Sequence, residues 1–229
     1  MRFASVFSNC GFMGFPFLQA LFGGTGLIGE ILIYGAVVNA VFTVLTWTVG
    51  VYMMSKDKKQ VSFKRIITTP SIIATILGFL VFLIVKVPLV DLAVQGGTLD
   101  FIIEKFMTSL GYISEMITPL SMFVIGTRLA NVSFKKMVLN KNAYITSIFK
   151  LVVMSLVSML LVVFLPVSQT VKYTVFFLLS MPSATNTVLY ATRFNKDADE
   201  ASVYVLTTTI LCILTIPLMF LAFNGIVGI

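Results

Sequence analysis

The chain has no histidine among its 229 residues and only two cysteines. The absence of histidine excludes zinc-protease motifs, Ser-His and Cys-His catalysis, and histidine proton relays. Cys10 and Cys212 stand alone in apolar runs, where a thiol behaves as a small hydrophobic side chain, and no CxxC spacing is present. A GxxxxGK[ST] phosphate loop is also missing, so the sequence predicts neither an enzyme nor an ATP-driven pump, and no metal or cofactor.

Charge is scarce as well. Charged residues make up 11% of the chain, whereas a soluble domain carries roughly 25%. Hydrophobic residues make up 58%, and the mean hydropathy is +1.03. The net charge of +7 would fit nucleic-acid binding, but Lys and Arg gather in short loops between apolar runs, as the positive-inside rule requires. The composition therefore predicts an all-α membrane protein in the lipid bilayer, with no nucleic-acid partner.

The apolar runs are long enough for about seven transmembrane helices. The loops at 55–65 and 128–142 are rich in Lys and Arg, whereas the loop at 88–101 carries only acids. This alternation predicts a multi-pass protein of the plasma membrane with a cytoplasmic N-terminus and an outside C-terminus. The predicted spans are 3–22, 27–54, 70–87, 103–127 (kinked or reset at Pro119), 143–165, 173–192 and 201–224.

The first and the sixth of these runs each contain a helix-breaking segment, at 9–16 and 180–187. Both segments combine an asparagine with proline, which lacks a backbone donor, and the first also contains glycine. Opened backbone is tolerated in hydrocarbon only inside protein or beside a wet cavity, and paired interrupted helices point to a transport site. The sequence therefore predicts two broken helices that meet near the middle of the bilayer.

The two ends of the chain align weakly with each other at an offset of 170 residues. Each broken span is followed by a short acidic turn and one unbroken span, and the predicted topology gives the two units opposite orientations. This arrangement indicates inverted repeats. The aligned positions are Phe7 with Phe177, Glu30 with Glu200, Tyr34 with Tyr204, and Gly11 to Pro16 with Met181 to Asn186.

Five ordered motifs resemble those of the auxin efflux carrier family, the bacterial and plant permeases related to the PIN-formed carriers. They are NCGFMGFP at 9–16, TPSIIATILGF at 69–79, PLSMFVIGTRL at 119–129, MPSATN at 181–186 and TIPL at 215–218. The resemblance covers essentially the whole chain. It implies a fold like that of bile-acid/sodium symporters, with ten helices in two inverted five-helix repeats whose fourth and ninth helices are broken and cross at the substrate site.

Against that family pattern the chain begins at the fourth helix, so we expect it to lack the first three. The end of the first repeat then covers 1–54, a basic cytoplasmic linker covers 55–65, and the second five-helix repeat covers 66–229.

The predicted substrate site lies where the broken helices meet. Helix N-termini there offer backbone N–H groups to a carboxylate, carbonyl ends suit a cation, and the asparagine amides add hydrogen bonds. The alternative is that the segments are kinks whose asparagines bond a neighbouring helix. The candidate substrate-binding residues are Asn9, Gly11, Gly14, Pro16, Pro182, Asn186 and Thr187.

One acid, Glu115, lies about the middle of a predicted span. Glu115 is a candidate for ion coupling, to a proton or sodium, because an acid in a membrane is costly. The alternative is a structural acid that is protonated or paired with Lys150, although we expect Lys150 itself to extend toward the cytoplasmic surface. Glu30 and Glu200 stand at helix starts, where acids complement the helix dipole.

These observations predict a secondary transporter that moves a small organic anion, such as an auxin-like carboxylate or a dicarboxylate, by alternating access. The first alternative is a non-transporting truncated fragment or an assembly partner of such a permease, and a more remote one is an intramembrane enzyme. The substrate, the direction of transport, the coupling ion and the oligomeric state, a homodimer among the options, stay open.

Overall fold

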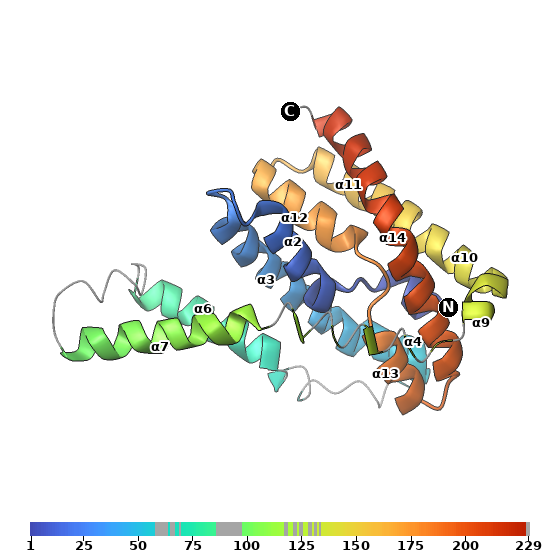
Figure 1. The fold of residues 1–229 in the computed structure, drawn as a ribbon, viewed down its shortest axis with the longest axis horizontal. Helices are drawn as coiled ribbons and strands as arrows, with labels where there is room; N and C mark the ends of the chain where they lie inside the picture. Colours follow the sequence, from blue (N-terminus) through green and yellow to red (C-terminus); the bar gives the residue numbers. More distant parts are fainter. Residues whose placement is uncertain are drawn as a thin grey trace.

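The computed structural model describes residues 1–57, 70–85, 98–116 and 134–227, together with a few isolated positions between these ranges. Every regular element within them is a helix, and one isolated β-bridge joins Ser8 to Ser183 (Figure 1). The elements are α1 (Arg2–Val6), the π-helical turn η1 (Cys10–Gly14), α2 (Phe15–Phe22), α3 (Ile28–Leu45), η2 (Thr46–Gly50), α4 (Val51–Ser55), α6 (Pro70–Val85), α7 (Thr98–Glu115), α9 (Phe134–Leu139), α10 (Lys141–Ser147), η5 (Ile148–Val153), α11 (Met154–Phe164), α12 (Gln169–Ser180), α13 (Asn186–Arg193) and α14 (Ala198–Val227).

Three continuous helices in the described ranges are long and apolar enough to cross a membrane. They run over Ile28–Ser55, Lys141–Phe164 and Ala198–Ile226. Each coincides with a predicted span, and π-helical turns interrupt the first two without ending them. The structure is therefore that of an all-helical membrane protein.

Two further helices, α6 and α7, lie at the third and fourth predicted spans. Helix α7 ends at Glu115, shortly before Pro119, whose missing N–H and ring oppose continuation of a helix. The predicted continuation to residue 127, most of the basic linker, and the acidic loop with Pro88 and Asp91 lie wholly or partly outside the described residues.

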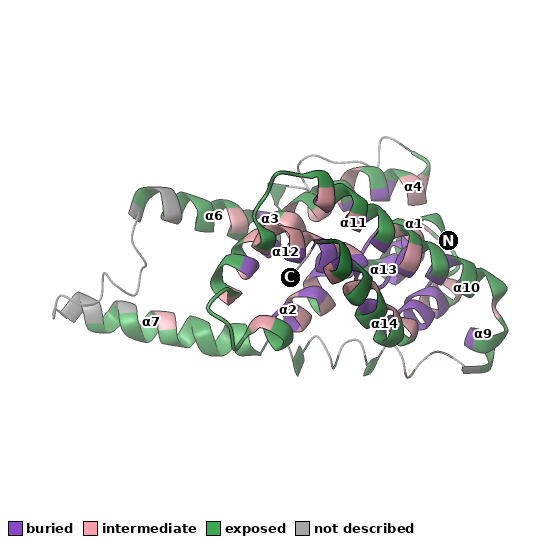
Figure 2. Cartoon of the chain, turned by 90° about the horizontal axis from the view of Figure 1, so that it is seen from above, coloured by how far each residue is buried: buried purple, intermediate pink, exposed green. Residues whose placement is uncertain are grey.

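The centre of the molecule is α12, which packs between α3 on one side and α11 on the other. Its aromatic side chains meet those of α14: the rings of Phe176 and Phe223 stack at 4.3 Å, and those of Phe177 and Phe220 lie 5.1 Å apart. Close packing of this kind holds helices together in lipid, where exclusion of water contributes little. Figure 2 shows the buried residues concentrated in this body. One half of a predicted broken helix is thus fixed at the core.

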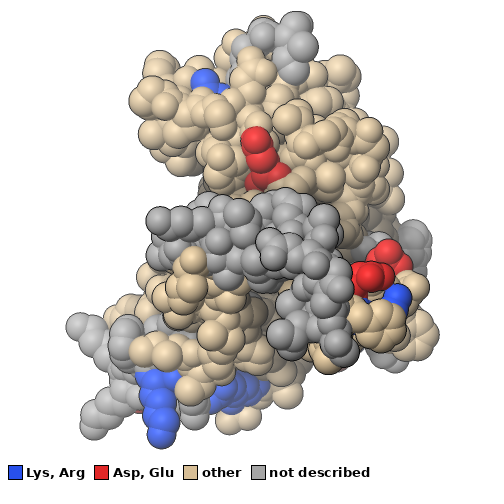
Figure 3. All heavy atoms as spheres, turned by 90° about the vertical axis from the view of Figure 1, so that its left-hand side faces the viewer, with Lys and Arg blue, Asp and Glu red and all other residues tan. Residues whose placement is uncertain are grey.

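Helices α6 and α7 project from this body (Figure 1), and Figure 2 shows them exposed along most of their length. Their exposed side chains are mainly apolar; Ile84, Phe101 and Ile113 are 78%, 61% and 63% exposed. The face seen in Figure 3 is mostly uncharged over its described surface, with basic side chains most prominent at its lower end and a few acidic side chains near its middle and right edge. Such a surface suits contact with lipid tails.

Candidate functional site

Both predicted broken helices are interrupted in the structure. After α1 the chain turns extended at Phe7 (φ −83°, ψ 126°) and becomes helical again at Cys10. After α12 it turns extended at Met181 (φ −59°, ψ 151°), and α13 begins at Asn186. The second break lies where it was predicted. The first lies earlier than predicted: the unwound residues are Phe7 to Asn9, so they share only Asn9 with the predicted segment 9–16, and residues 10–16 are helical.

The glycines and the proline of that segment are accommodated by a wider helical turn. Gly14 N–H donates to Asn9 O at 3.0 Å, and Phe15 N–H donates to Cys10 O, which is the π-helical pattern. The widening comes directly before Pro16, which has no N–H to donate. The turn thus absorbs the proline, and the prediction that Gly11, Gly14 and Pro16 lie in opened backbone is wrong.

The two breaks pair with each other through a short antiparallel contact, which we call the crossing (Phe7–Asn9 with Pro182–Ala184). Asn9 N–H donates to Pro182 O at 2.8 Å, and Ala184 N–H donates to Phe7 O at 2.9 Å. Each break therefore satisfies backbone groups that the other leaves open, as a membrane interior demands. Ser8 and Ser183 are 175 positions apart, so the predicted offset of 170 residues does not superimpose the two breaks.

Side chains fasten the crossing to its neighbours. Ser183 Oγ donates to Ala4 O at 2.6 Å, and the thiol of Cys10 lies 3.4 Å from Leu178 O. From α14, Thr208 Oγ1 accepts the N–H of Ser183 at 3.2 Å. These buried contacts hold the opened backbone in one position.

We expect Thr208→Val to destabilise the protein by about 1–3 kcal/mol, because the buried N–H of Ser183 would lose its acceptor at nearly constant side-chain volume. The measurement is thermal unfolding of the purified protein in detergent. Thr207→Val is the matched control: Thr207 is equally buried, but its hydroxyl bonds only Val203 O of its own helix. Equal losses in the two variants would contradict the role given to Thr208.

A cavity of about 370 Å³ lies beside the crossing. Three amide side chains border it: Asn9 from the first break, Asn39 from the middle of α3, and Asn186 from the start of α13. Within the described part of the chain, none of these three side chains is hydrogen-bonded. They are thus available to a ligand. The other lining residues are Ser8, Cys10, Gly11, Phe12, Phe42, Thr43, Thr46, Trp47, Ala184, Thr185, Leu189 and Tyr190.

The structure gathers some of the predicted substrate-binding residues at this cavity and not others. Asn9, Gly11 and Asn186 border it, and Pro182 accepts a hydrogen bond in the crossing itself. The remaining three lie apart from it. Gly14 packs against Leu178, Pro16 is buried near the start of α2, and Thr187 donates to Ala184 O at 2.6 Å and borders a different cavity.

Sequence reasoning missed Asn39, Trp47 and Tyr190 as cavity residues. A usable signal existed for Asn39, since an amide in the middle of an otherwise apolar helix is expected to face protein or a cavity. The two aromatic residues carried no such signal.

Lys150 was predicted to extend toward the cytoplasmic surface. In the structure it is instead fully buried at the crossing. Its Nζ donates to Ser8 Oγ at 2.6 Å and to Leu179 O at 3.0 Å. Leu179 O is one of the last carbonyls of α12, which lack partners within the helix and carry partial negative charge. The carbonyl end of α12 thus accepts a hydrogen bond from the ammonium, which water would accept if the side chain reached the cytoplasmic surface.

Glu115 is exposed at the last residue of α7 and borders none of the described cavities. The considered partnership with Lys150 is absent among the described contacts, since the ammonium is bonded to Ser8 and Leu179. The role of Glu115 in ion coupling stays a prediction. Glu30 and Glu200 lie in the first turns of α3 and α14, as predicted.

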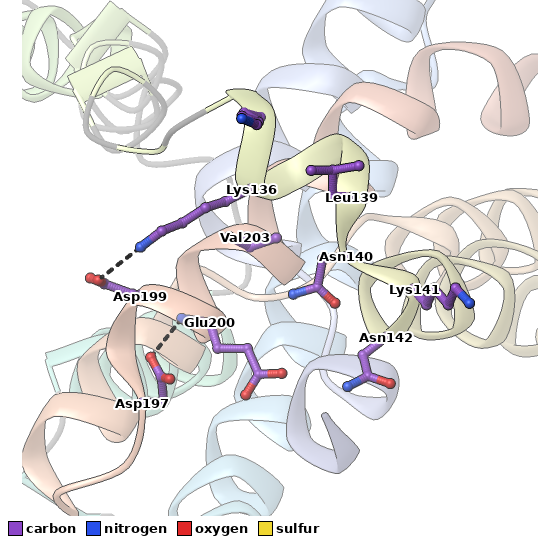
Figure 4. Close-up of a pocket in the computed structure, with 10 residues that line it drawn as sticks. Lys136, Leu139, Asn140, Lys141, Asn142, Asp197, Asp199, Glu200 and Val203 are labelled. Carbon is purple, nitrogen blue, oxygen red and sulfur yellow. Dashed lines mark hydrogen bonds and ion pairs between the residues drawn. The ribbon is translucent and has the colours of Figure 1, made fainter.

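Two charged cavities lie near the start of α14. The smaller, of about 360 Å³, is bordered by Arg2, Lys56, Lys196, Asp197 and Glu200 among others. The larger has a volume of about 820 Å³. Two of the residues that border it, Lys136 of α9 and Asp199, form an ion pair in which Nζ and Oδ2 lie 3.8 Å apart (Figure 4). Both are bordered by residues from segments that the charge bias assigns to the cytoplasm.

An aromatic pair stands between the crossing cavity and the smaller charged cavity. Tyr190 borders the first, Phe3 borders the second, and their rings meet edge to face at 5.4 Å. The rings of Trp47 and Tyr190 also meet edge to face, at 5.6 Å. One ring contact, Phe3 with Tyr190, therefore joins a residue that borders one cavity to a residue that borders the other.

Comparison with known proteins gives two matches. Residues 59–220 match a family model described as membrane transport protein. The chain is also 26% identical over 217 residues to an uncharacterized transporter of Methanocaldococcus jannaschii. That alignment covers 93% of this chain and 65% of the relative, so the chain spans just under two thirds of the curated relative's length. No solved structure matches the chain.

Proposed function

We propose, from the premise that this chain belongs to the membrane transport protein family, that it is a secondary transporter that carries a small organic anion through the crossing. Family membership confirms the predicted resemblance to a permease and points to a transport protein rather than an enzyme. The substrate class, the mechanism and the site residues form the proposal.

The observation that carries the proposal is the crossing itself, with a cavity beside it whose three amide side chains have no hydrogen-bond partner among the described residues. Amide groups and the first N–H groups of η1 and α13 are donors that suit a carboxylate, and unwound backbone at membrane depth is expected only where it is buried or lines a cavity. A volume of about 370 Å³ is in the lower part of the range for small-molecule sites. A carboxylate of the size of a dicarboxylate or an indole acid fits this space.

Alternating access supplies the mechanism. The crossing cavity and the smaller charged cavity border the same half-helix, α13, and each is bordered by one ring of the Phe3–Tyr190 contact. We propose that this pair parts when one bundle rocks against the other around a fixed crossing, as in transporters built from inverted repeats. The same proposal includes the seven membrane spans, the cytoplasmic N-terminus, the two repeats at 1–54 and 66–229, the plasma membrane location and the coupling ion.

Reconstitution tests the function. Purified protein in liposomes without ATP is loaded with unlabelled malonate, malate or indole-3-acetate, and entry of the same labelled anion is followed against protein-free liposomes. We expect saturable counterflow of at least one of these anions. Counterflow of none of them would overturn the proposal for these carboxylates and favour a non-transporting fragment or assembly partner.

A further inference from the structure

Lys150 places a positive charge inside the protein at the crossing. It lies in η5, the widened turn in the middle of the continuous helix Lys141–Phe164, and its side chain is 0% exposed. Its ammonium contacts both halves of the crossing, because Ser8 follows α1 in the first break and Leu179 lies at the end of α12.

A buried ammonium is costly unless its charge is compensated. In the described residues no carboxylate forms an ion pair with Lys150; the ion pairs found there join Lys105 to Glu104 and Lys136 to Asp199. Its compensation comes instead from a hydroxyl and a carbonyl, with Ser8 Oγ itself donating to Leu179 O at 2.9 Å. Neutral groups of this kind balance the charge only in part, so the crossing keeps an excess of positive charge.

The position of that charge is informative. Carbonyl ends of broken helices are the places where transporters hold a free sodium ion or proton. Here the last turn of α12 presents its carbonyl to an amine that is covalently part of the protein. Ser8 lines the crossing cavity, so the ammonium lies one hydrogen bond behind the cavity wall.

We infer that Lys150 is the fixed cation of the crossing: it occupies the carbonyl end of α12 in place of a free ion, and an anion binds in the cavity against this charge without sodium. The inference rests on the proposed function and deepens it, since it assigns the source of anion selectivity. It also removes sodium from the coupling ions that the sequence left open.

The first test needs no substrate. Thermal unfolding of the wild-type protein and of Lys150→Met is compared in NaCl and in choline chloride at equal ionic strength. We expect the wild type to unfold at the same temperature in both salts. Lys150→Met should lose stability in choline, and sodium should restore about 3 °C or more by filling the vacated carbonyl end.

The second test uses malonate and indole-3-acetate as probes in titrations of purified protein. We expect equal wild-type affinity in both salts, at least about tenfold weaker binding by Lys150→Met in choline, and near-wild-type binding by Lys150→Arg, which keeps the charge. Lys105→Met, which removes an exposed charge on α7, is the control and should bind as the wild type does.

Stabilisation of the wild type by sodium, or undiminished anion affinity in Lys150→Met, would overturn the inference. Absence of any probe binding by the wild type would instead count against the proposed substrate class, and the sodium comparison would still decide the role of Lys150. Should Lys150→Met fail to fold, the wild type in the two salts and Lys150→Arg decide it.

Discussion

Replacing Asn186 by alanine is expected to weaken binding of a carboxylate probe by about 10- to 100-fold and to leave the unfolding temperature nearly unchanged. The magnitude follows from the loss of one hydrogen bond to a charged group, about 1.5–3 kcal/mol. Stability should persist because Asn186 is exposed at the start of α13 and its amide is not bonded within the described residues. Titration with malonate and indole-3-acetate measures the affinity, and scanning calorimetry measures the stability.

The same experiment on Asn9→Ala should give a similar loss of affinity from the opposite side of the cavity. Asn224→Ala is the matched control, because the Asn224 amide accepts from the Tyr173 hydroxyl at 3.2 Å and borders none of the described cavities. We expect that variant to lose some stability and to keep its affinity. Unchanged binding in both Asn9→Ala and Asn186→Ala would show that the amides serve only the fold.

Gly14→Ala is expected to lower the stability by about 1–3 kcal/mol and to abolish counterflow. A Cβ at Gly14 would lie 2.5 Å from Cδ2 of Leu178, a fully buried side chain on α12. Leu178 is 0% exposed within the hydrophobic core, so it can retreat only by displacing other buried side chains. The clash would push α12 away from the first broken helix and so disturb the crossing.

The double variant Gly14→Ala/Leu178→Ala tests the mechanism, since it removes the obstructing methyl. We expect it to be more stable than the sum of its single changes predicts. Gly29→Ala is the control, because nothing lies within 4 Å of its added Cβ, and alanine there favours the helix. Wild-type stability and counterflow in Gly14→Ala would refute the close approach as a requirement.

The sequence predicted the main elements because their causes are local. Long apolar runs account for the helices Ile28–Ser55, Lys141–Phe164 and Ala198–Ile226. The second break was also predictable, because Pro182 stands in the unwound segment and accepts its partner's hydrogen bond. The gathering of amides from both breaks followed from the reasoning that opened backbone must line a cavity.

What escaped prediction has causes far away in the chain. Phe7 to Asn9 contain neither glycine nor proline, and they unwind where residues 182–184 provide partners for their backbone groups. Gly11 to Pro16 look like a break locally, yet a π-helical turn keeps them helical. Lys150 was expected at the surface because nothing nearby in sequence announces the Leu179 carbonyl that holds it.

The bond between Asn9 and Pro182 has a consequence for biosynthesis. A ribosome releases the N-terminal partner long before its C-terminal counterpart exists, and the helices between them enter the bilayer in the meantime. During that interval the nascent chain must keep the peptide groups around Ser8 hydrated or shielded, and the native pairing closes only after residues 182–184 have been synthesised. The two halves of the crossing therefore join after the helices between them have been made.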